Sequence, residues 1–168
     1  NDIIQLSRLD EAGETPKEPV DLYEVAGEVK EALTESAAKH KVTLHLEGVS
    51  CEMQGVRRYL YEIIYNLCDN AIRYNKEGGS VTVSLQKQEN ASVLTVSDTG
   101  IGIPQEQQSH VFERFYRVDK SHSKETGGTG LGLSVVKHAV AYHNGSVQLR
   151  SREGEGTQIT VTFPDKTE

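Results

Sequence analysis

The sequence has few of the features that mark secreted or membrane-spanning proteins. It contains only two cysteines, Cys51 and Cys68, with no CxxC pair and no paired disulfide framework. This pattern favours reduced thiols in a cytosolic compartment. No apolar run approaches the roughly 20 residues that span a bilayer, and no signal peptide begins the chain.

Tryptophan is absent and positive charge is in deficit. Eighteen basic and 25 acidic residues leave a net charge of −7. General nucleic-acid binding relies on a basic face, so this balance disfavours it, although a small anionic ligand is not excluded. The apolar content of 36% and charged content of 26% are typical of a soluble globular protein. A length of 168 residues fits one domain with a real core.

Hydrophobic periodicity divides the chain into elements. Residues 1–12 have near-helical apolar spacing, and the prolines of TPKEP make 13–20 a linker before the main domain at 21–168. The remaining pattern predicts helices at 21–39, 56–74 and 130–143, strands at 42–48 and 51–55, and hairpins at 80–98 and 146–163.

These elements predict an α+β protein, in which three helices cover one face of a mixed, mostly antiparallel sheet of four or five strands. A doubly wound fold is disfavoured because regular βαβ alternation is absent. The last long helix should end at Asn144-Gly145. The first should be capped by Asp21 and bury one stripe, which comprises Leu22, Val25, Val29, Ala32 and Leu33.

The helix at 56–74 has an unusual polar row beside its apolar one. Glu62, Asn66 and Asn70 follow each other at intervals of four, so they lie on one face. Asn is a poor helix former, and two alternatives explain its use here. The row is either a solvated face or a set of oxygen ligands for Mg²⁺ shared with substrate phosphates. The core stripe of this helix comprises Leu60, Ile63, Ile64, Leu67 and Ala71.

The stretch SDTGIGIP at 97–104 ends a strand on Asp98 and continues through Gly100 and Gly102. The glycines allow close backbone approach to a ligand. A carboxylate there can accept a hydrogen bond from the exocyclic amine of adenine, whereas guanine has a carbonyl at that position. The alternative is an Asx-turn, which is common in such sequences.

The stretch GGTGLGLS at 127–134 places four glycines immediately before a helix. Free N–H groups and the helix dipole suit phosphate at that point. No GK[ST] closes the run and the third glycine of GxGxxG is missing, so neither a Walker A loop nor a Rossmann fold is indicated. A flexible linker fits poorly, because a helix begins inside the run.

The stretch FERFYRVDK at 112–120 combines aromatic residues with Arg114, Arg117 and Lys120. Its cations could reach phosphate while the aromatic residues hold a loop. A small satellite core beneath a surface loop explains the aromatic residues equally well. For Arg117 we favour phosphate binding.

Together, these motifs resemble the ATP-binding catalytic domain of sensor histidine kinases. ExxxNLCDNAIRY resembles the N box of that family, DTGIG its G1 box, FERFYR its F box and GGTGLGLS its G2 box. EGEGT at 153–157 is similar to a shorter box in the last hairpin. The resemblance covers residues 21–164, and the ordered set is far more specific than any single box.

The resemblance implies the Bergerat fold of gyrase, Hsp90 and MutL, with Asn66 and Asn70 binding Mg²⁺. Asn66, Arg117 and Glu62 would be catalytic, Glu62 by orienting a metal-bound water unless it only caps the polar row. Residues 105–126 would form a lid over ATP. The implied ATP-binding residues are Asn66, Asn70, Arg73, Tyr74, Asp98, Gly100, Ile101, Gly102, Ile103, Arg114, Tyr116, Arg117, Gly128, Thr129, Gly130, Leu131, Gly132, Leu133 and Thr157.

That family phosphorylates a histidine followed by an acidic residue on a separate helical dimerisation domain. None of the six histidines here is followed by Asp or Glu. The acceptor is therefore expected outside this chain, and residues 1–12 resemble the last turns of the second dimerisation helix. Gly55 stands where many relatives have Asp, which we interpret as a tolerated variation.

The expected function is transfer of the γ-phosphate of Mg-ATP to that histidine, for onward transfer to a response regulator. The fragment should be monomeric and belong to the cytoplasmic part of a membrane-bound sensor kinase. Two alternatives are weighed. One is another Bergerat protein, an ATPase or an anti-sigma serine kinase. The other is a nucleotide-sensing or interaction module without transfer activity.

Overall fold

A computed structural model describes residues 16–103 and 132–164. The N-terminal segment 1–15, which contains the predicted helix end and the first three residues of the predicted linker, lies outside the described residues. Within these ranges the elements are β1 (Glu18–Asp21), α2 (Leu22–Lys39), β2 (Thr43–Gly48), β3 (Glu52–Gly55), α3 (Arg57–Arg73), β4 (Ser80–Gln88), β5 (Ala91–Asp98), α5 (Gly132–Tyr142), β6 (Ser146–Arg152) and β7 (Gly156–Pro164).

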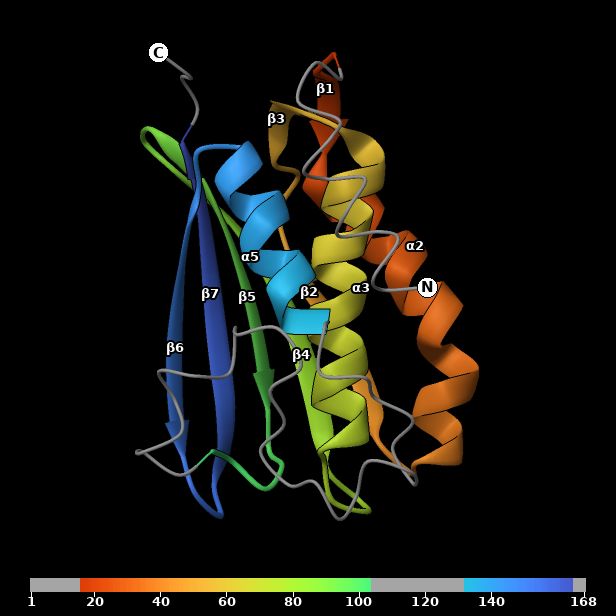
Figure 1. Cartoon of the computed structure of the whole chain (residues 1–168). Helices are drawn as coiled ribbons and strands as arrows, with labels where there is room; N and C mark the ends of the chain where they lie inside the picture. The colour runs from red at the N-terminus through yellow and green to blue at the C-terminus, as the bar shows by residue number, and fades with distance from the viewer. Residues whose placement is uncertain (1–15, 104–131, 165–168) are drawn as a thin grey trace.

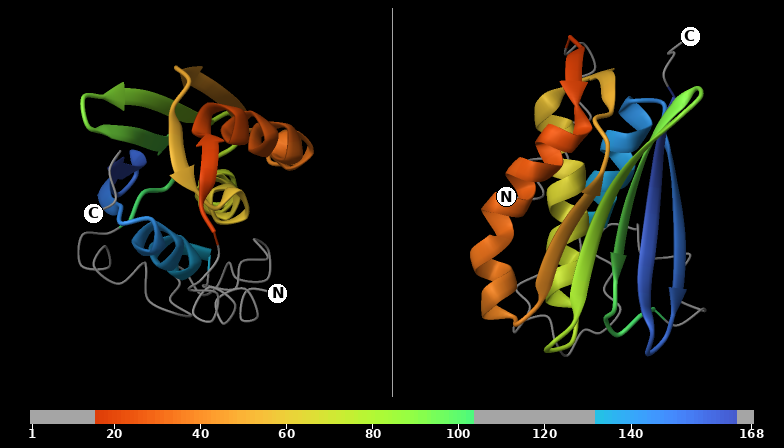
Figure 2. Two further views of the ribbon diagram at one scale, coloured as in Figure 1. Left: turned by 90° about the horizontal axis from the view of Figure 1, so that it is seen from above. Right: turned by 180° about the vertical axis from the view of Figure 1, so that it is seen from behind.

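The described elements form two layers, as the sequence predicted. A five-stranded sheet has the order β2-β4-β5-β7-β6, and α2, α3 and α5 lie side by side over one of its faces (Figure 1). The pair β2–β4 is parallel and the other neighbours are antiparallel. The view from above separates the helical layer from the curved sheet (Figure 2). The predicted α+β sandwich with a mixed, mostly antiparallel sheet is confirmed.

The described residues contain seven strands, five in the main sheet and two in a separate sheet, whereas four or five were expected. The strand that no sequence pattern predicted is β1, which pairs antiparallel with β3 in the two-stranded sheet. Glu18, Pro19 and Val20 fall in the stretch that we predicted as linker. Pro19 has no N–H to donate, which suits an edge strand. Val20 is 2% exposed, so this short strand contributes to the core.

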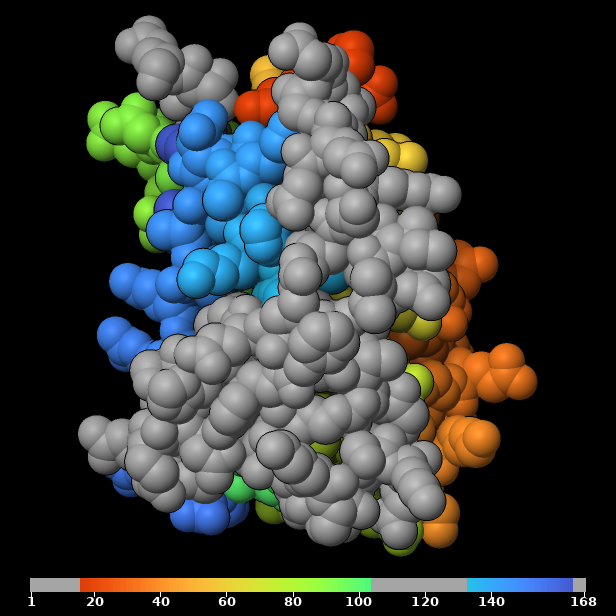
Figure 3. Space-filling model, viewed as in Figure 1, coloured from red at the N-terminus to blue at the C-terminus, as the bar shows by residue number. Residues whose placement is uncertain are grey.

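The core fills the space between the helices and the sheet. All five apolar residues predicted for the stripe of α3 are buried. In α2 the prediction was wrong for Ala32, which is exposed, whereas Ala26 and Ala37 are buried. At 100° per residue the buried stripe drifts toward positions 26, 33 and 37, which turns position 32 outward. In the space-filling view α2 occupies one edge of the molecule and β6 the opposite edge (Figure 3).

Both cysteines are unpaired, as the sequence predicted, and both are buried. Burial raises the pKa of the Cys68 thiol to about 12, and the charge of Asp69 adds to the shift. Over residues 16–103 and 132–164, the helices are too short or too polar to span a bilayer.

Asp21 caps α2 and also fixes the loop that precedes β3. Its Oδ1 accepts hydrogen bonds from the N–H groups of Tyr23 and Cys51, both at 3.0 Å. Its Oδ2 accepts one from the Ser50 hydroxyl at 2.7 Å. Burial tends to raise the pKa of Asp21, but these hydrogen bonds outweigh it and lower the pKa below the ordinary value. The predicted N-cap is confirmed.

His143 joins the two helices that flank the predicted nucleotide site. The N–H of Val56, at the start of α3, donates to its Nε2 at 3.0 Å, and its Nδ1 donates to the carbonyl of Ala139 at 2.7 Å. The ring is 1% exposed. A Cβ at Gly55 would approach this ring and the end of the Leu60 side chain, so a larger residue here would require both to shift. Asn144 then ends the helix with a φ of 58°, as predicted.

Stability should depend on pH through His143. Burial lowers the pKa of His143; the Ala139 hydrogen bond opposes this shift and the charge of Lys17 adds to it. The unfolded chain therefore takes up the proton first, and stability is lost as the pH falls below about 6.5. We expect His143→Leu to cost about 1–3 kcal/mol at pH 8, because the N–H of Val56 loses its acceptor.

Urea unfolding at pH 8 and pH 5.5 tests this expectation. The loss of stability between the two pH values should be smaller in His143→Leu than in the wild type. The matched control is His45→Gln, which changes an exposed histidine on β2 and should keep the wild-type difference. An equal pH dependence in wild type and His143→Leu would contradict the assignment.

Candidate functional site

The polar row of α3 has a defined orientation. The side-chain nitrogen of Asn66 donates to the carbonyl of Glu62 at 2.6 Å and approaches its carboxylate at 3.4 Å. The side-chain nitrogen of Asn70 donates to the carbonyl of Asn66 at 3.1 Å. Each amide nitrogen is thus held against the helix, and within the described part of the chain neither side-chain oxygen accepts a hydrogen bond. Two oxygen acceptors one turn apart therefore remain for a ligand.

This donor set suits a hard cation. Mg²⁺ prefers oxygen ligands and completes its shell with waters and substrate phosphates. Among residues 16–103 and 132–164 there is no cluster of three or more His, Cys, Asp or Glu side chains that could hold a metal alone. Asn66 and Asn70 fit a metal that arrives with a phosphorylated ligand.

The end of α3 continues this row with a positive charge. Arg73 donates from Nε to both oxygens of Asp69, at 3.0 and 2.9 Å. The next residue, Tyr74, ends the helix, and its carbonyl accepts the N–H of Ile101 at 3.1 Å. The loop that follows β5 is therefore attached directly to the end of α3.

Asp98 lies at the end of β5, on the side of the sheet that faces the helices. Its Oδ1 accepts hydrogen bonds from the N–H groups of Gly100 at 2.8 Å and Thr157 at 3.2 Å. The first of these is the Asx-turn that the sequence left as an alternative. No described residue donates to Oδ2. Burial raises the pKa of the carboxyl, and the two backbone hydrogen bonds oppose this shift. One oxygen thus shapes the loop and the other is left for a ligand.

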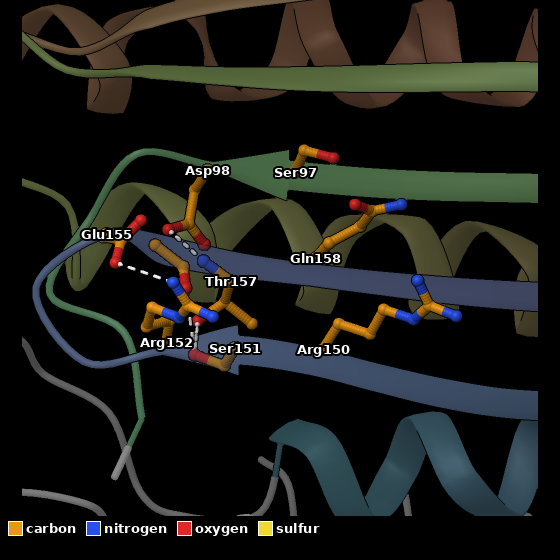
Figure 4. A pocket seen from close by; sticks show the side chains of 9 residues that line it. Ser97, Asp98, Arg150, Ser151, Arg152, Glu155, Thr157 and Gln158 are labelled. Carbon is orange, nitrogen blue, oxygen red and sulfur yellow. Dashed lines mark hydrogen bonds and ion pairs between the residues drawn. The ribbon is translucent and has the colours of Figure 1, made fainter. Parts of the chain in front are cut away.

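The strand neighbours of Asp98 form the floor of this region. Figure 4 shows Asp98, Thr157 and Ser151 adjacent to one another on β5, β7 and β6. The Ser151 hydroxyl accepts the N–H of Ile103 at 2.7 Å and lies 2.8 Å from the Thr157 hydroxyl. A polar hollow of about 370 Å³ at this end of the sheet is lined by residues of both faces, because Ser97, Arg150 and Gln158 alternate with Asp98, Ser151 and Thr157 along their strands. Its other lining residues are Arg152, Glu155 and Gly156.

A second set of side-chain contacts holds the loop after α3 against β4 and β5. The Asn75 amide donates to the carbonyl of Ser80 at 2.9 Å, and its oxygen lies 3.3 Å from the Thr99 hydroxyl. That hydroxyl also accepts the N–H of Ser80 at 2.9 Å. Asn75, Thr99, Ser151 and Asp69 were not among our predicted site residues. Only Asp69, four positions before Arg73, carried a local signal that could have identified it.

The remaining predicted site residues divide into two groups. Ile101 is 44% exposed and Ile103 half-buried, while Gly132 is the first residue of α5 and Leu133 packs against the core. Gly102 has a φ of 71°, a conformation that favours glycine. The other predicted residues lie outside the described ranges, so their placement stays a prediction; they are Arg114, Tyr116, Arg117, Gly128, Thr129, Gly130 and Leu131.

Gly100 should be intolerant of a side chain. A Cβ at this position would collide with the carbonyl oxygen of Tyr74 and approach Asn75 and Asp98. We expect Gly100→Ala to lower the free energy of unfolding by about 1–3 kcal/mol, since the loop must move away from α3. Urea unfolding provides the measurement.

The matched control for Gly100→Ala is Gly27→Ala in the middle of α2. The nearest atom to a Cβ there is a Leu46 methyl at 4.0 Å, so the methyl group fits. Its helix propensity should stabilise the protein by about 0.5–1 kcal/mol. Equal stability of Gly100→Ala and wild type would show that the loop adapts without loss.

Comparison with known proteins gives a consistent set of matches. A family model described as histidine kinase-, DNA gyrase B-, and HSP90-like ATPase matches residues 55–167. The sensor-like histidine kinase SenX3 of Mycolicibacterium smegmatis is 40% identical, over 98% of this chain and 43% of its own length. The sensor histidine kinase WalK of Bacillus subtilis is 46% identical, over 64% of this chain and 18% of its own length.

A solved structure of the mycobacterial sensor histidine kinase MprB shares the fold, with a TM-score of 0.77 at 29% identity. The match covers 90% of this chain and 99% of that one. The full-length ShkA structure in complex with AMPPNP gives a TM-score of 0.84 over the whole of this chain, at 24% identity. The chain spans less than half the length of SenX3 and WalK.

Proposed function

Because the chain belongs to the family of histidine kinase-, DNA gyrase B- and HSP90-like ATPases and is the ATP-binding domain of a sensor histidine kinase, we propose that it performs the transfer step of such a kinase. In this proposal it binds Mg-ATP and transfers the γ-phosphate to a histidine on a helical dimerisation domain outside the chain. A response regulator then receives the phosphoryl group.

The observation that carries the proposal is that only one of the two carboxylate oxygens of Asp98 accepts hydrogen bonds from described residues. Its Oδ1 is held by two backbone N–H groups, so the carboxylate is fixed in direction. Its Oδ2 can then accept a hydrogen bond from the exocyclic amine of adenine. Guanine would place a carbonyl oxygen opposite the carboxylate, which repels it. Gly100 and Gly102 let the backbone approach the base, and Thr157 supports the floor.

The phosphate side of the site would be formed by α3. Asn66 and Asn70 use their side-chain nitrogens within the helix, and their side-chain oxygens would hold Mg²⁺, with Arg73 one turn further along the same helix. A bound Mg²⁺ would neutralise charge on the phosphate oxygens. Arg117 and the glycines before α5 are also predicted to bind the phosphates. Glu62 lies 3.4 Å from the Asn66 amide and helps to orient it, which is compatible with a role beside the metal.

The chain supplies positioning and charge, because the imidazole of the acceptor is itself the nucleophile. His143 is a poor acceptor, since it is buried and both ring nitrogens are hydrogen-bonded. This agrees with an acceptor outside the chain. In the same proposal the chain is a monomer, and it belongs to the cytoplasmic part of a membrane-bound sensor kinase.

The adenine pocket is tested by calorimetric titration with Mg-ADP and Mg-GDP. The wild type should prefer ADP by roughly a hundredfold or more, because the site is built to hydrogen-bond the amine. Asp98→Ala should lose ADP binding. The control is Thr95→Ala, a half-buried residue on the same strand that faces away from the helices. Equal binding of ADP and GDP, or no binding of either, would contradict the proposal.

Phosphoryl transfer is tested with radiolabelled ATP and a separately added helical dimerisation domain that carries the acceptor histidine. The chain alone should not label itself, and the added histidine should become labelled. The control is the same helical domain with that histidine replaced by glutamine. Steady ATP hydrolysis by the isolated chain would favour an ATPase. Nucleotide binding with neither hydrolysis nor labelling would favour a nucleotide-sensing module.

A further inference from the structure

The ion pair between Arg73 and Asp69 differs from the other ion pairs in the described part of the chain. Its side chains are only 28% and 22% exposed. The pairs Lys41–Glu77 and Arg152–Glu155 are at least 66% exposed on both sides. Arg57 is 38% exposed and pairs with Glu24 and Glu28, which are 64% and 48% exposed. Asp69 and Arg73 are therefore the most enclosed of these charged partners.

The hydrogen bonds of the pair use only one of the donors of Arg73. Both oxygens of Asp69 accept from Nε, at 3.0 and 2.9 Å. A guanidinium has five N–H donors in a planar fork. The four donors on the two terminal nitrogens make no hydrogen bond within the part of the chain that the structure describes. Asp69 thus holds the Nε side of the guanidinium, and the N–H groups of both terminal nitrogens remain available to a ligand.

Arg73 lies on the same face of α3 as the proposed metal ligands. Asn66, Asn70 and Arg73 are spaced by four and three residues, so they follow one another on a single face of α3. Arg73 therefore continues the row of amide side chains that we propose for Mg²⁺. An arginine fork matches phosphate oxygens in a bidentate manner, provided that its plane is held in place.

The negative charge of Asp69 would by itself oppose phosphate binding at this position. A carboxylate next to a triphosphate repels it, so its presence in this row should weaken ATP binding if charge alone acted. If Asp69 favours ATP binding, its effect on the orientation of Arg73 must therefore outweigh this repulsion.

We propose that Asp69 is a positioning residue that holds the Arg73 guanidinium toward the β- and γ-phosphates of the bound nucleotide. This inference rests on the proposed function and adds a residue that touches neither the base nor the metal. It also requires arginine at position 73. The three N–H donors of a lysine share one nitrogen, so Asp69 could not hold one edge of a planar fork in place while a second edge faces the phosphates.

The test measures the affinities of Mg-ATP and adenosine by calorimetry for four forms of the chain: wild type, Asp69→Asn, Arg73→Lys and the double variant. Asp69→Asn should weaken ATP binding by roughly threefold to tenfold, because the guanidinium loses its fixed plane. Adenosine affinity should not change, since adenosine has no phosphate. In the Arg73→Lys background, Asp69→Asn should no longer weaken ATP binding. Asp69→Glu, which keeps a carboxylate, should recover part of the loss.

The matched control is Glu28→Gln, which removes a carboxylate from Arg57 at the other end of α3. The 16-residue separation of Arg57 and Arg73 corresponds to about 24 Å along the helix. Glu28→Gln should leave both affinities unchanged.

Each other outcome has a distinct meaning. Unchanged or tighter ATP binding in Asp69→Asn would overturn the inference, because charge repulsion would then dominate. An equal loss of ATP and adenosine would also overturn it, since that indicates a general structural defect. Failure of the wild type to bind either ligand would instead overturn the proposed function, and this inference with it.

Discussion

The candidate site depends on one backbone hydrogen bond, from the N–H of Ile101 to the carbonyl of Tyr74 at 3.1 Å. The last carbonyls of a helix have no partner within it, and here one of them receives the loop that follows β5. Asp98 precedes this loop, whereas Asn70 and Arg73 lie in the last turns of α3. The bond therefore sets the separation between the residues proposed to bind the purine and those proposed to bind the phosphates.

The chemistry of the helix face depends on a second constraint, which is local. Asparagine side chains in a helix compete for backbone carbonyls, and Asn66 and Asn70 each use their nitrogen in this way. This competition is usually a cost to the helix, but here it holds each amide nitrogen in place and leaves each side-chain oxygen without a hydrogen bond from the described residues. Two poor helix formers are accommodated in a helix that buries eight residues in the core. The surrounding packing outweighs their propensity.

The sequence predicted those parts of the molecule that local patterns determine. The three helices and the β4–β5 and β6–β7 hairpins follow from apolar periodicity and turn residues, and they appear where expected. Strand β1 did not, because its order comes from pairing with β3 more than 30 positions later. The hydrogen bond between Ser151 and Ile103 likewise could not be predicted from local sequence, since the residues are 48 positions apart. The motifs therefore predicted which side chains could bind a ligand, whereas contacts between residues distant in sequence determine the shape of the surrounding loops and strands.

The burial of both cysteines has a practical consequence. Cys51 and Cys68 are 0% and 1% exposed, and they are the only thiols in the sequence. The raised pKa of Cys68 further suppresses the thiolate that alkylating reagents attack. A single cysteine introduced on an exposed strand residue would then be the one group that a maleimide dye reaches in the folded chain. Fluorescent or spin labels could thus be placed near the nucleotide site while both native cysteines are kept.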